Sequence, residues 1–301
     1  MEPTSCKQPE GIEIDAKVYE LYDEYCHGEM NRREFLNQAS VLAIAGGAGL
    51  AMAQALLPRY AEAQTIAFTD KRIKANYVNY DSPGGNSGAM RGYLVRPTST
   101  GPFPSVIVIH ENRGLNPYIE DVARRAAVAG FLALAADGLF PVGGYPGNDD
   151  DGKALQRSLD QARLKRDMLN SALYLRAHEH STGKLGAVGF CWGGGTANFL
   201  ATTMGADLQA AVPFYGAAPP SAEVANIKCS LLIQSAQNDA RINAMWPDFE
   251  AALKANGVSY QRHLYPGTRH GFHNNSTPRY NEAAANLAWE RTIEFWRHHL
   301  T

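Results

Sequence analysis

The stretch Val188-Gly-Phe-Cys-Trp-Gly-Gly-Gly-Thr196 decides how the fold of this chain is interpreted. It follows an apolar run and precedes a helix-forming segment, so it predicts a tight strand-to-helix turn with Cys191 at its apex. Such a turn lifts one side chain above the carboxyl edge of a sheet, and the neighbouring glycines allow backbones to approach closely. The related pattern G-x-S-x-G has serine where this chain has Cys191. The positive end of the following helix favours a thiolate at this position.

Buried strands and amphipathic helices alternate on both sides of this turn. Apolar runs predict strands over residues 104–111, 131–138, 184–190, 208–216, 229–239 and 259–266. Helical periodicity predicts helices over residues 116–130, 153–178, 193–205, 243–257 and 280–300, and residues 139–152 are expected to form a loop. Residues 72–82 and 88–97 alternate polar and apolar residues and predict an antiparallel hairpin at the sheet edge. The predicted fold is therefore α/β, with a mostly parallel central sheet and helices on both faces.

Composition excludes several classes of function. The chain has 301 residues, of which 45% are hydrophobic and 19% charged, and its net charge is −2. No basic stripe indicates a nucleic-acid partner. The four cysteines are too few for a disulfide scaffold, and none has zinc-ligand spacing. The cysteine spacing therefore gives no reason to expect a metal. We expect a monomer that needs no cofactor.

The first 63 residues have the features of an export signal. Arg32 and Arg33 are followed by a Gly- and Ala-rich apolar run from Val41 to Leu57 and by Ala61-Glu-Ala63. This pattern resembles a twin-arginine signal peptide that is cleaved after Ala63. It predicts a periplasmic or otherwise exported protein, the twin-arginine export machinery as a partner, and two parts, residues 1–63 and 64–301. The alternative is a membrane-anchoring helix, but the run is short and weakly apolar for a lasting anchor.

Three other roles for Cys191 compete with that of a nucleophile. A phosphate cradle would need G-x-G-x-x-G or a Walker A pattern, and the turn matches neither. A buried inert cysteine is common in cores. A redox pair with Cys229 is disfavoured, because Cys229 begins its strand whereas Cys191 follows the end of another. In a parallel sheet these points lie about 20 Å apart, whereas a disulfide joins α-carbons about 6 Å apart.

A nucleophile at this turn needs an acid and a histidine later in the chain, in that order. Asp239 ends the predicted strand 229–239, and His270 lies in a Gly-containing segment after the last strand. Both positions fit. His273 is the nearest rival as base, and His263 lies inside a predicted strand, where a structural role is expected.

The segment after the strand 104–111 adds further candidates. In this fold class its backbone supplies one N–H group of the oxyanion hole, for which we expect Asn112, paired with the N–H group of Trp192. Glu111 would lie at the same sheet edge. It is either a solvated or capping residue or the group that accepts the proton of Cys191.

The motifs Val106–Leu115, Phe131–Phe140, Gly186–Gly195, Gln234–Asp239 and Tyr265–Phe272 together resemble the dienelactone hydrolase family of α/β-hydrolases. The resemblance implies a triad of Cys191, His270 and Asp239, with Glu111 pairing with the resting thiol. In the family an arginine that binds the substrate carboxylate stands four residues after the histidine, where this chain has Asn274. Arg113 is the candidate that replaces it in substrate binding.

The expected function is hydrolysis of a small lactone or carboxylic ester through a covalent acyl-enzyme. A thiolate attacks carbonyls well but is also a good leaving group, so sulfur favours esters and lactones over amides. The alternatives on the same fold are a ligand-binding protein without turnover and a thiol redox protein.

Overall fold

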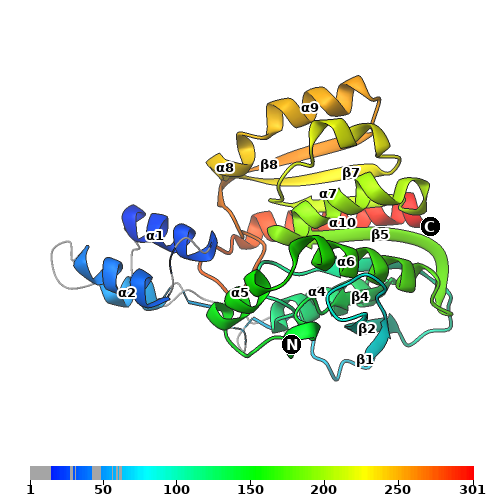
Figure 1. Cartoon of the computed structure of the whole chain (residues 1–301), viewed down its shortest axis with the longest axis horizontal. Coiled ribbons are helices and arrows are strands. Elements are labelled where there is room, and N and C mark those ends of the chain that lie inside the picture. Colours follow the sequence, from blue (N-terminus) through cyan, green and yellow to red (C-terminus); the bar gives the residue numbers. More distant parts are fainter. Residues whose placement is uncertain are drawn as a thin grey trace.

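The computed structural model describes residues 15–27, 30, 32–42, 49–55, 57–58, 60 and 63–301. A single eight-stranded sheet crosses the molecule in the order β1-β2-β4-β3-β5-β6-β7-β8 (Figure 1). The strands are β1 (Ile73–Asp81), β2 (Ala89–Pro97), β3 (Phe103–Ile109), β4 (Leu132–Ala136), β5 (Ser181–Phe190), β6 (Ala210–Phe214), β7 (Ser230–Asn238) and β8 (Tyr260–Arg269).

The sheet confirms the predicted α/β-hydrolase architecture. Strand β2 is antiparallel to both β1 and β4, and every other neighbouring pair is parallel. The predicted hairpin is β1 and β2, with Ile73 opposite Pro97 at one end and Asp81 opposite Ala89 at the other. Its polar–apolar alternation fits an edge that is covered on one face only.

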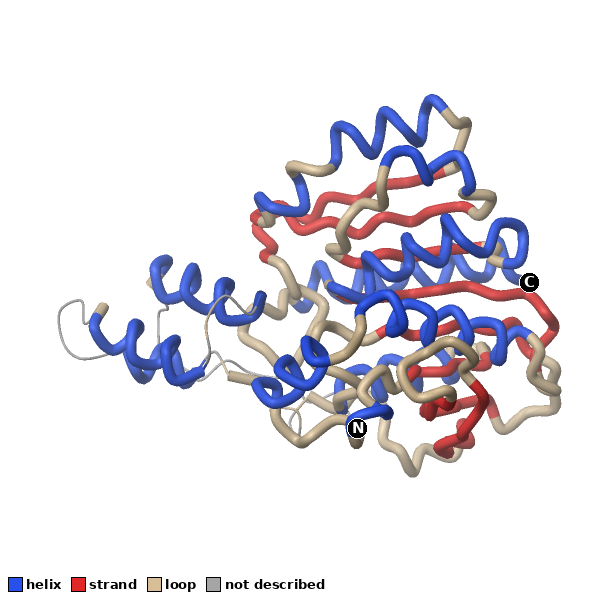
Figure 2. The backbone as a smooth tube through the Cα atoms, viewed as in Figure 1, coloured by secondary structure: helices blue, strands red, loops and turns tan. Residues whose placement is uncertain are grey.

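Helices cover both faces of the sheet (Figure 2). Helices α4 (Pro117–Val128) and α10 (Glu282–Leu300) pack on one face, and α6 (Gln161–Arg176), α7 (Trp192–Met204) and α9 (Trp246–Ala255) pack on the other. Strands β4 and β6 are buried along their whole length, which explains why their sequences are continuous apolar runs. Short helices complete the described chain: η1 (Phe140–Val142), η2 (Gly205–Asp207), η3 (Ser221–Asn226) and α8 (Ala240–Asn243).

The helix predicted over residues 153–178 is two helices. Helix α5 (Asp149–Ser158) ends before Leu159, whose backbone is extended, and α6 begins after Asp160. The Asp160 carboxylate accepts hydrogen bonds from the N–H groups of Ala162 and Arg163. This N-cap satisfies N–H donors at the start of a new helix, which a continuous helix would have bonded internally. The apolar periodicity runs across the break and gives no sign of it. The predicted loop 139–152 likewise contains η1 and the first turn of α5.

The N-terminal helices form a small core of their own. Helices α1 (Ala16–His27), α2 (Arg32–Val41) and α3 (Gly49–Ala55) bury an aromatic and aliphatic cluster of Val18, Tyr22, Tyr25, Phe35, Ala39 and Ala53. Figure 1 shows α1 and α2 on the side of the molecule where α5 and α8 lie. Among the described residues, no helix is both long and apolar enough to cross a membrane. Residues 31, 43–48, 56, 59 and 61–62 of the predicted export signal lie outside the described residues.

Candidate active site

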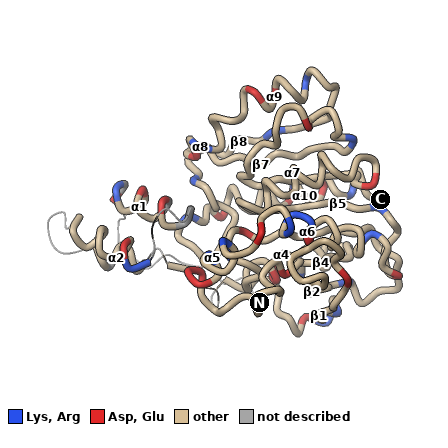
Figure 3. Tube along the Cα trace, in the orientation of Figure 1, with Lys and Arg blue, Asp and Glu red and all other residues tan. Residues whose placement is uncertain are grey.

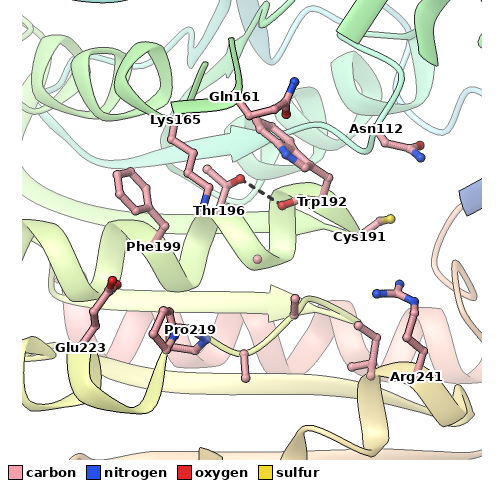
Figure 4. A pocket seen from close by; sticks show the side chains of 15 residues that line it. Asn112, Gln161, Lys165, Cys191, Trp192, Thr196, Phe199, Pro219, Glu223 and Arg241 are labelled. Atoms are coloured by element: carbon pink, nitrogen blue, oxygen red, sulfur yellow. Dashed lines mark hydrogen bonds between the residues drawn. The ribbon is translucent and has the colours of Figure 1, made fainter. Parts of the chain in front are cut away.

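Cys191 stands in a strained turn between β5 and α7. Its backbone has φ 56° and ψ −114°, a combination that residues other than glycine rarely adopt. The N–H group of Cys191 donates to the carbonyl of Phe214 on the neighbouring strand at 3.1 Å. Figure 4 shows the thiol at the start of α7, on the rim of a cavity. The turn therefore has the predicted elbow geometry.

Glycines next to the elbow allow three backbone segments to meet. A Cβ atom on Gly193 would lie 2.4 Å from the Ile109 carbonyl oxygen, and one on Gly194 would lie 2.5 Å from the Phe214 carbonyl oxygen. By contrast, a Cβ atom on Gly195 would lie no closer than 3.5 Å to another atom. The close approach to β3 and β6 therefore requires glycine at positions 193 and 194. Position 195 has room for a larger residue.

Asp239 and His270 are hydrogen-bonded partners. Asp239 follows the last residue of β7 and caps α8, with one carboxylate oxygen accepting from the Ile242 N–H group. Its other oxygen, Oδ2, lies 2.6 Å from His270 Nδ1. Both side chains are buried. This bond directs the Nδ1 proton to Asp239, which leaves Nε2 as the nitrogen for proton transfer.

His270 also interacts with Cys191, and the two groups favour each other's charged forms. Burial lowers the pKa of His270, but the charge of Cys191 and hydrogen bonds to Asp239 and Cys191 raise it to about 10. Burial raises the pKa of Cys191. The charge of His270 and a hydrogen bond from it outweigh burial, so the pKa of Cys191 lies below its ordinary value. The electrostatics of the two groups therefore favour a resting thiolate–imidazolium pair.

The other candidate histidines do not share this position. His273 is fully buried, its Nδ1 lies 2.7 Å from the Tyr118 hydroxyl, and its ring stacks on Phe190. Burial and the charge of Arg125 lower its pKa well below the usual value. His263 lies within β8, as the sequence indicated, in register with Gln234.

Glu111 is buried rather than solvated. Its Oε2 atom accepts a hydrogen bond from Asn274 Nδ2 at 3.1 Å and lies 3.6 Å from Arg113 Nε. Its charge acts to raise the pKa of Cys191, so the carboxylate is electrically close to the thiol. Asn274, at the position of the family's arginine, therefore contacts Glu111.

Arg113 lies outside the cavity in which it was expected to bind substrate. Its Nη1 atom lies 2.6 Å from Asp149 Oδ2, its side chain is only 3% exposed, and it does not line the cavity beside Cys191. The guanidinium is held between Asp149 and Glu111 because burial of an arginine requires paired carboxylates. The prediction that Arg113 binds substrate is therefore not supported by its placement.

The cavity beside Cys191 has a volume of about 730 Å³. Asn112 and Trp192, the two expected oxyanion donors, both line it next to the thiol (Figure 4). Trp192 is the first residue of α7, so its N–H group has no acceptor within the helix. The remaining lining residues are Gln161, Lys165, Gly195, Thr196, Phe199, Ala217, Ala218, Pro219, Pro220, Glu223, Arg241 and Ile242.

Two features of the site were not identified from the sequence. His110 stacks on the Trp192 ring, with centroids 5.4 Å apart, and its Nε2 atom accepts from the Gly138 N–H group. The cationic side chains of Lys165 and Arg241 line the cavity and come from α6 and α8. The sequence gives no signal for the stacking of His110 or for the two cations in the cavity. Both depend on how the helices pack over the edge of the sheet.

Cys229 is buried directly before β7, and burial raises its pKa to about 12. Within the part of the chain that the structure describes, Cys191 and Cys229 are free thiols, and no cluster of three or more His, Cys, Asp or Glu residues could hold a metal ion.

Charged residues of both signs are interspersed over the described chain (Figure 3).

Comparison with known proteins gives two family matches. The model of the dienelactone hydrolase family matches residues 90–300, and a YqhI-like model matches residues 8–45. A protein of Saccharolobus solfataricus named as a carboxymethylenebutenolidase is 31% identical over 254 residues, which cover 72% of this chain and 96% of that protein. A protein of Bradyrhizobium named as a 2-oxo-3-(5-oxofuran-2-ylidene)propanoate lactonase is 31% identical over 231 residues, covering 72% of this chain and 92% of its own.

Solved structures show the same relationship. A crystal structure named as a dienelactone hydrolase of Klebsiella pneumoniae is 26% identical, with a TM-score of 0.66 over 75% of this chain and 99% of that one. The dienelactone hydrolase-like promiscuous phosphotriesterase P91, from metagenomic libraries, is also 26% identical, with a TM-score of 0.65 over 76% of this chain and 100% of its own.

Proposed function

This chain belongs to the dienelactone hydrolase family and is a lactone or ester hydrolase, and we propose that it cleaves its substrate through a covalent acyl-enzyme on Cys191. The observation that carries the proposal is the placement of Cys191 at a positive-φ elbow beside a histidine whose Nδ1 lies 2.6 Å from Asp239. This arrangement supports the proposed roles of Cys191 as nucleophile, His270 as base and Asp239 as orienting acid in acyl transfer.

In the first half of the reaction, the Cys191 thiolate attacks the carbonyl carbon and the C=O electron pair moves to oxygen. The backbone N–H groups of Asn112 and Trp192 are the proposed donors to this oxyanion. As the tetrahedral intermediate collapses, the C–O bond to the leaving group breaks. The Nε2 proton of His270 is transferred to that oxygen, which gives an alcohol or, from a lactone, the hydroxyl of the opened ring.

In the second half, neutral His270 removes a proton from water. The hydroxide formed attacks the thioester carbon, and the C–S bond breaks to release the carboxylic acid. Asp239 stabilises the imidazolium formed in this step by accepting its Nδ1 proton in a hydrogen bond. Glu111 is buried and its charge raises the pKa of Cys191, so we propose that it takes up the thiol proton only in molecules in which His270 is neutral.

The cavity favours an anionic substrate. Figure 4 shows Arg241 near Cys191 and Lys165 on the other side of the cavity, beside Thr196 and Phe199. These two cations outnumber the one carboxylate in the lining, that of Glu223. We assign them the carboxylate-binding role that Asn274 cannot fulfil as a neutral residue. The Bradyrhizobium relative is named for a lactone that carries a propanoate group, which fits this assignment.

Loss of turnover in Cys191→Ala tests the proposed mechanism. The variant should lose hydrolysis of a lactone and aryl-ester panel while its melting temperature stays near that of the parent chain, because the alanine removes only the sulfur. Cys229→Ala is the matched control and should keep full activity, because its thiol lies away from the cavity. Full activity of the Cys191 variant would refute the mechanism, and tight ligand binding without hydrolysis by the parent chain would favour a binding protein.

We also propose that the chain is exported by the twin-arginine pathway. Arg32 and Arg33 are exposed at the beginning of α2, where an export receptor could reach them. Replacing both with lysine should retain the protein in the cytoplasm of an expressing cell. Equal periplasmic amounts of parent and variant would refute export by this pathway.

A further inference from the structure

A buried charge network lies behind Glu111. Arg113 is shared between Glu111, at 3.6 Å, and Asp149, at 2.6 Å. The other oxygen of Asp149 accepts hydrogen bonds from the Tyr60 hydroxyl at 2.7 Å and the Tyr145 hydroxyl at 3.0 Å. These two hydroxyl groups share the negative charge of Asp149. The more of this charge they take up, the more weakly Asp149 attracts Arg113 away from Glu111.

Tyr60 comes from the N-terminal extension and not from the hydrolase domain. Its hydroxyl also accepts a hydrogen bond from Asn116 Nδ2 at 2.9 Å, and its ring packs edge-on against Tyr145. Burial and the charge of Asp149 raise the pKa of Tyr60 well above its usual range, so the phenol stays protonated and donates.

Other contacts fix the extension on the domain. Lys153 Nζ donates to the Tyr25 carbonyl at 2.9 Å and lies 3.4 Å from the centroid of the Tyr25 ring. Arg279 lies over the Tyr22 ring at 4.9 Å, and Asn275 Nδ2 donates to the Ala63 carbonyl at 2.6 Å. Both cationic side chains are buried, so these contacts involve desolvated charges that stabilise the docked position.

We propose that Tyr60 is a positioning residue of the active site, which acts on Cys191 through Asp149, Arg113 and Glu111. The inference rests on the proposed role of Cys191 as nucleophile. Without the Tyr60 hydroxyl, Asp149 keeps one phenol donor, Tyr145, and draws Arg113 more strongly. The negative charge of Glu111 is then less compensated, and it disfavours the thiolate of Cys191. The titratable groups that act on the thiol are His270, Glu111, Arg113 and Tyr215, and Arg241 lines the cavity beside it.

The pH dependence of Cys191 alkylation by iodoacetamide, measured on the full chain, tests the inference. In Tyr60→Phe the midpoint should rise by about half a pH unit, which slows alkylation about threefold below it. The acid limb of kcat/KM should move in parallel. Tyr19→Phe, the same substitution in α1, is the control and should leave both unchanged.

Asp149→Asn provides a second test in the opposite direction. The neutral amide releases Arg113 to Glu111, so the alkylation midpoint should fall. Unchanged midpoints in both variants would overturn the inference while leaving the proposed function intact, whereas an active Cys191→Ala chain would overturn the proposed function itself. A lower melting temperature of Tyr60→Phe with an unshifted midpoint would show a purely structural role and would also overturn the inference.

Processing of the extension would remove this contact. Cleavage after Ala63 would detach Tyr60 from the domain. A chain that begins at Gln64 after export should therefore show the alkylation profile of Tyr60→Phe, and an unaltered profile in that chain would contradict the role of Tyr60.

Discussion

His270 and Asp239 lie 31 residues apart in the chain, yet His270 Nδ1 is 2.6 Å from Asp239 Oδ2. Their strands, β7 and β8, are parallel neighbours, so both residues leave the sheet at the same edge. Cys191 leaves the same edge at the end of β5. A parallel sheet thus brings three separate segments together at one place, which is why chain order could predict the grouping.

Asp239→Asn should lower kcat by about 10³- to 10⁴-fold, because an amide favours the wrong imidazole tautomer and does not stabilise the imidazolium. Steady-state assays of aryl-ester hydrolysis measure kcat of the variant and of the parent chain directly. Asp207→Asn, at a half-exposed residue paired with Arg176, is the control and should leave kcat unchanged. A loss of less than about tenfold in the Asp239 variant would argue against its orienting role.

The rate should depend on pH through the Cys191–His270 pair. As pH falls, the thiolate takes up a proton and kcat/KM decreases. As pH rises, His270 loses its proton through a pKa of about 10, and the leaving oxygen no longer has a proton donor. The profile of kcat/KM should therefore stay high to about pH 10 and then fall. A basic limb near neutral pH would contradict the ion pair.

Gly193→Ala should destabilise the fold by about 1–3 kcal/mol, because its new Cβ atom overlaps the backbone of β3. Gly195→Ala in the same helix would make only ordinary van der Waals contacts, with Ala217 at 3.5 Å or more, and should be neutral or stabilising by up to about 1 kcal/mol. Urea unfolding of the two variants compares them under one condition. Equal stability of the pair would show that backbone contact at the elbow does not demand glycine.

Lys165→Met and Arg241→Met should each raise KM for an anionic ester about tenfold, the loss expected for one charged hydrogen bond. KM for a neutral ester of the same leaving group should change less than about twofold, because only the charged contact is lost. Lys254→Met, at an exposed lysine paired with Glu250 outside the cavity, is the control. Equal effects on both esters would remove the two cations as determinants of specificity.

The inner strands could be predicted from the sequence because they are buried on both faces and therefore read as apolar runs. The edge hairpin could be predicted instead from its alternation of polar and apolar residues. The helix break at Leu159 and Asp160 could not, because apolar spacing continues across it and only the capping by Asp160 interrupts the helix. Chain order also predicted that His270 rather than His273 would lie beside Asp239. The ring of His273 is instead enclosed by Tyr118 and Phe190, a contact set by three-dimensional packing.

The environment of Arg113 shows the limit of inference from local sequence. Its proximity to Glu111 along the chain predicted a position beside the substrate. Its ion pair with Asp149, which is 36 residues away, withdraws it from the cavity. The partners of a buried charge come from the whole fold, so sequence proximity alone could not assign its role.

The central claim is that the substrate acyl group passes through the Cys191 sulfur. Rapid mixing with a slowly hydrolysed aryl ester, acid quenching and peptide mass spectrometry test it most directly. The predicted result is a transient acyl adduct on the peptide that contains Cys191, formed and lost at rates that account for turnover. Turnover at the full rate with that cysteine unmodified throughout would contradict it.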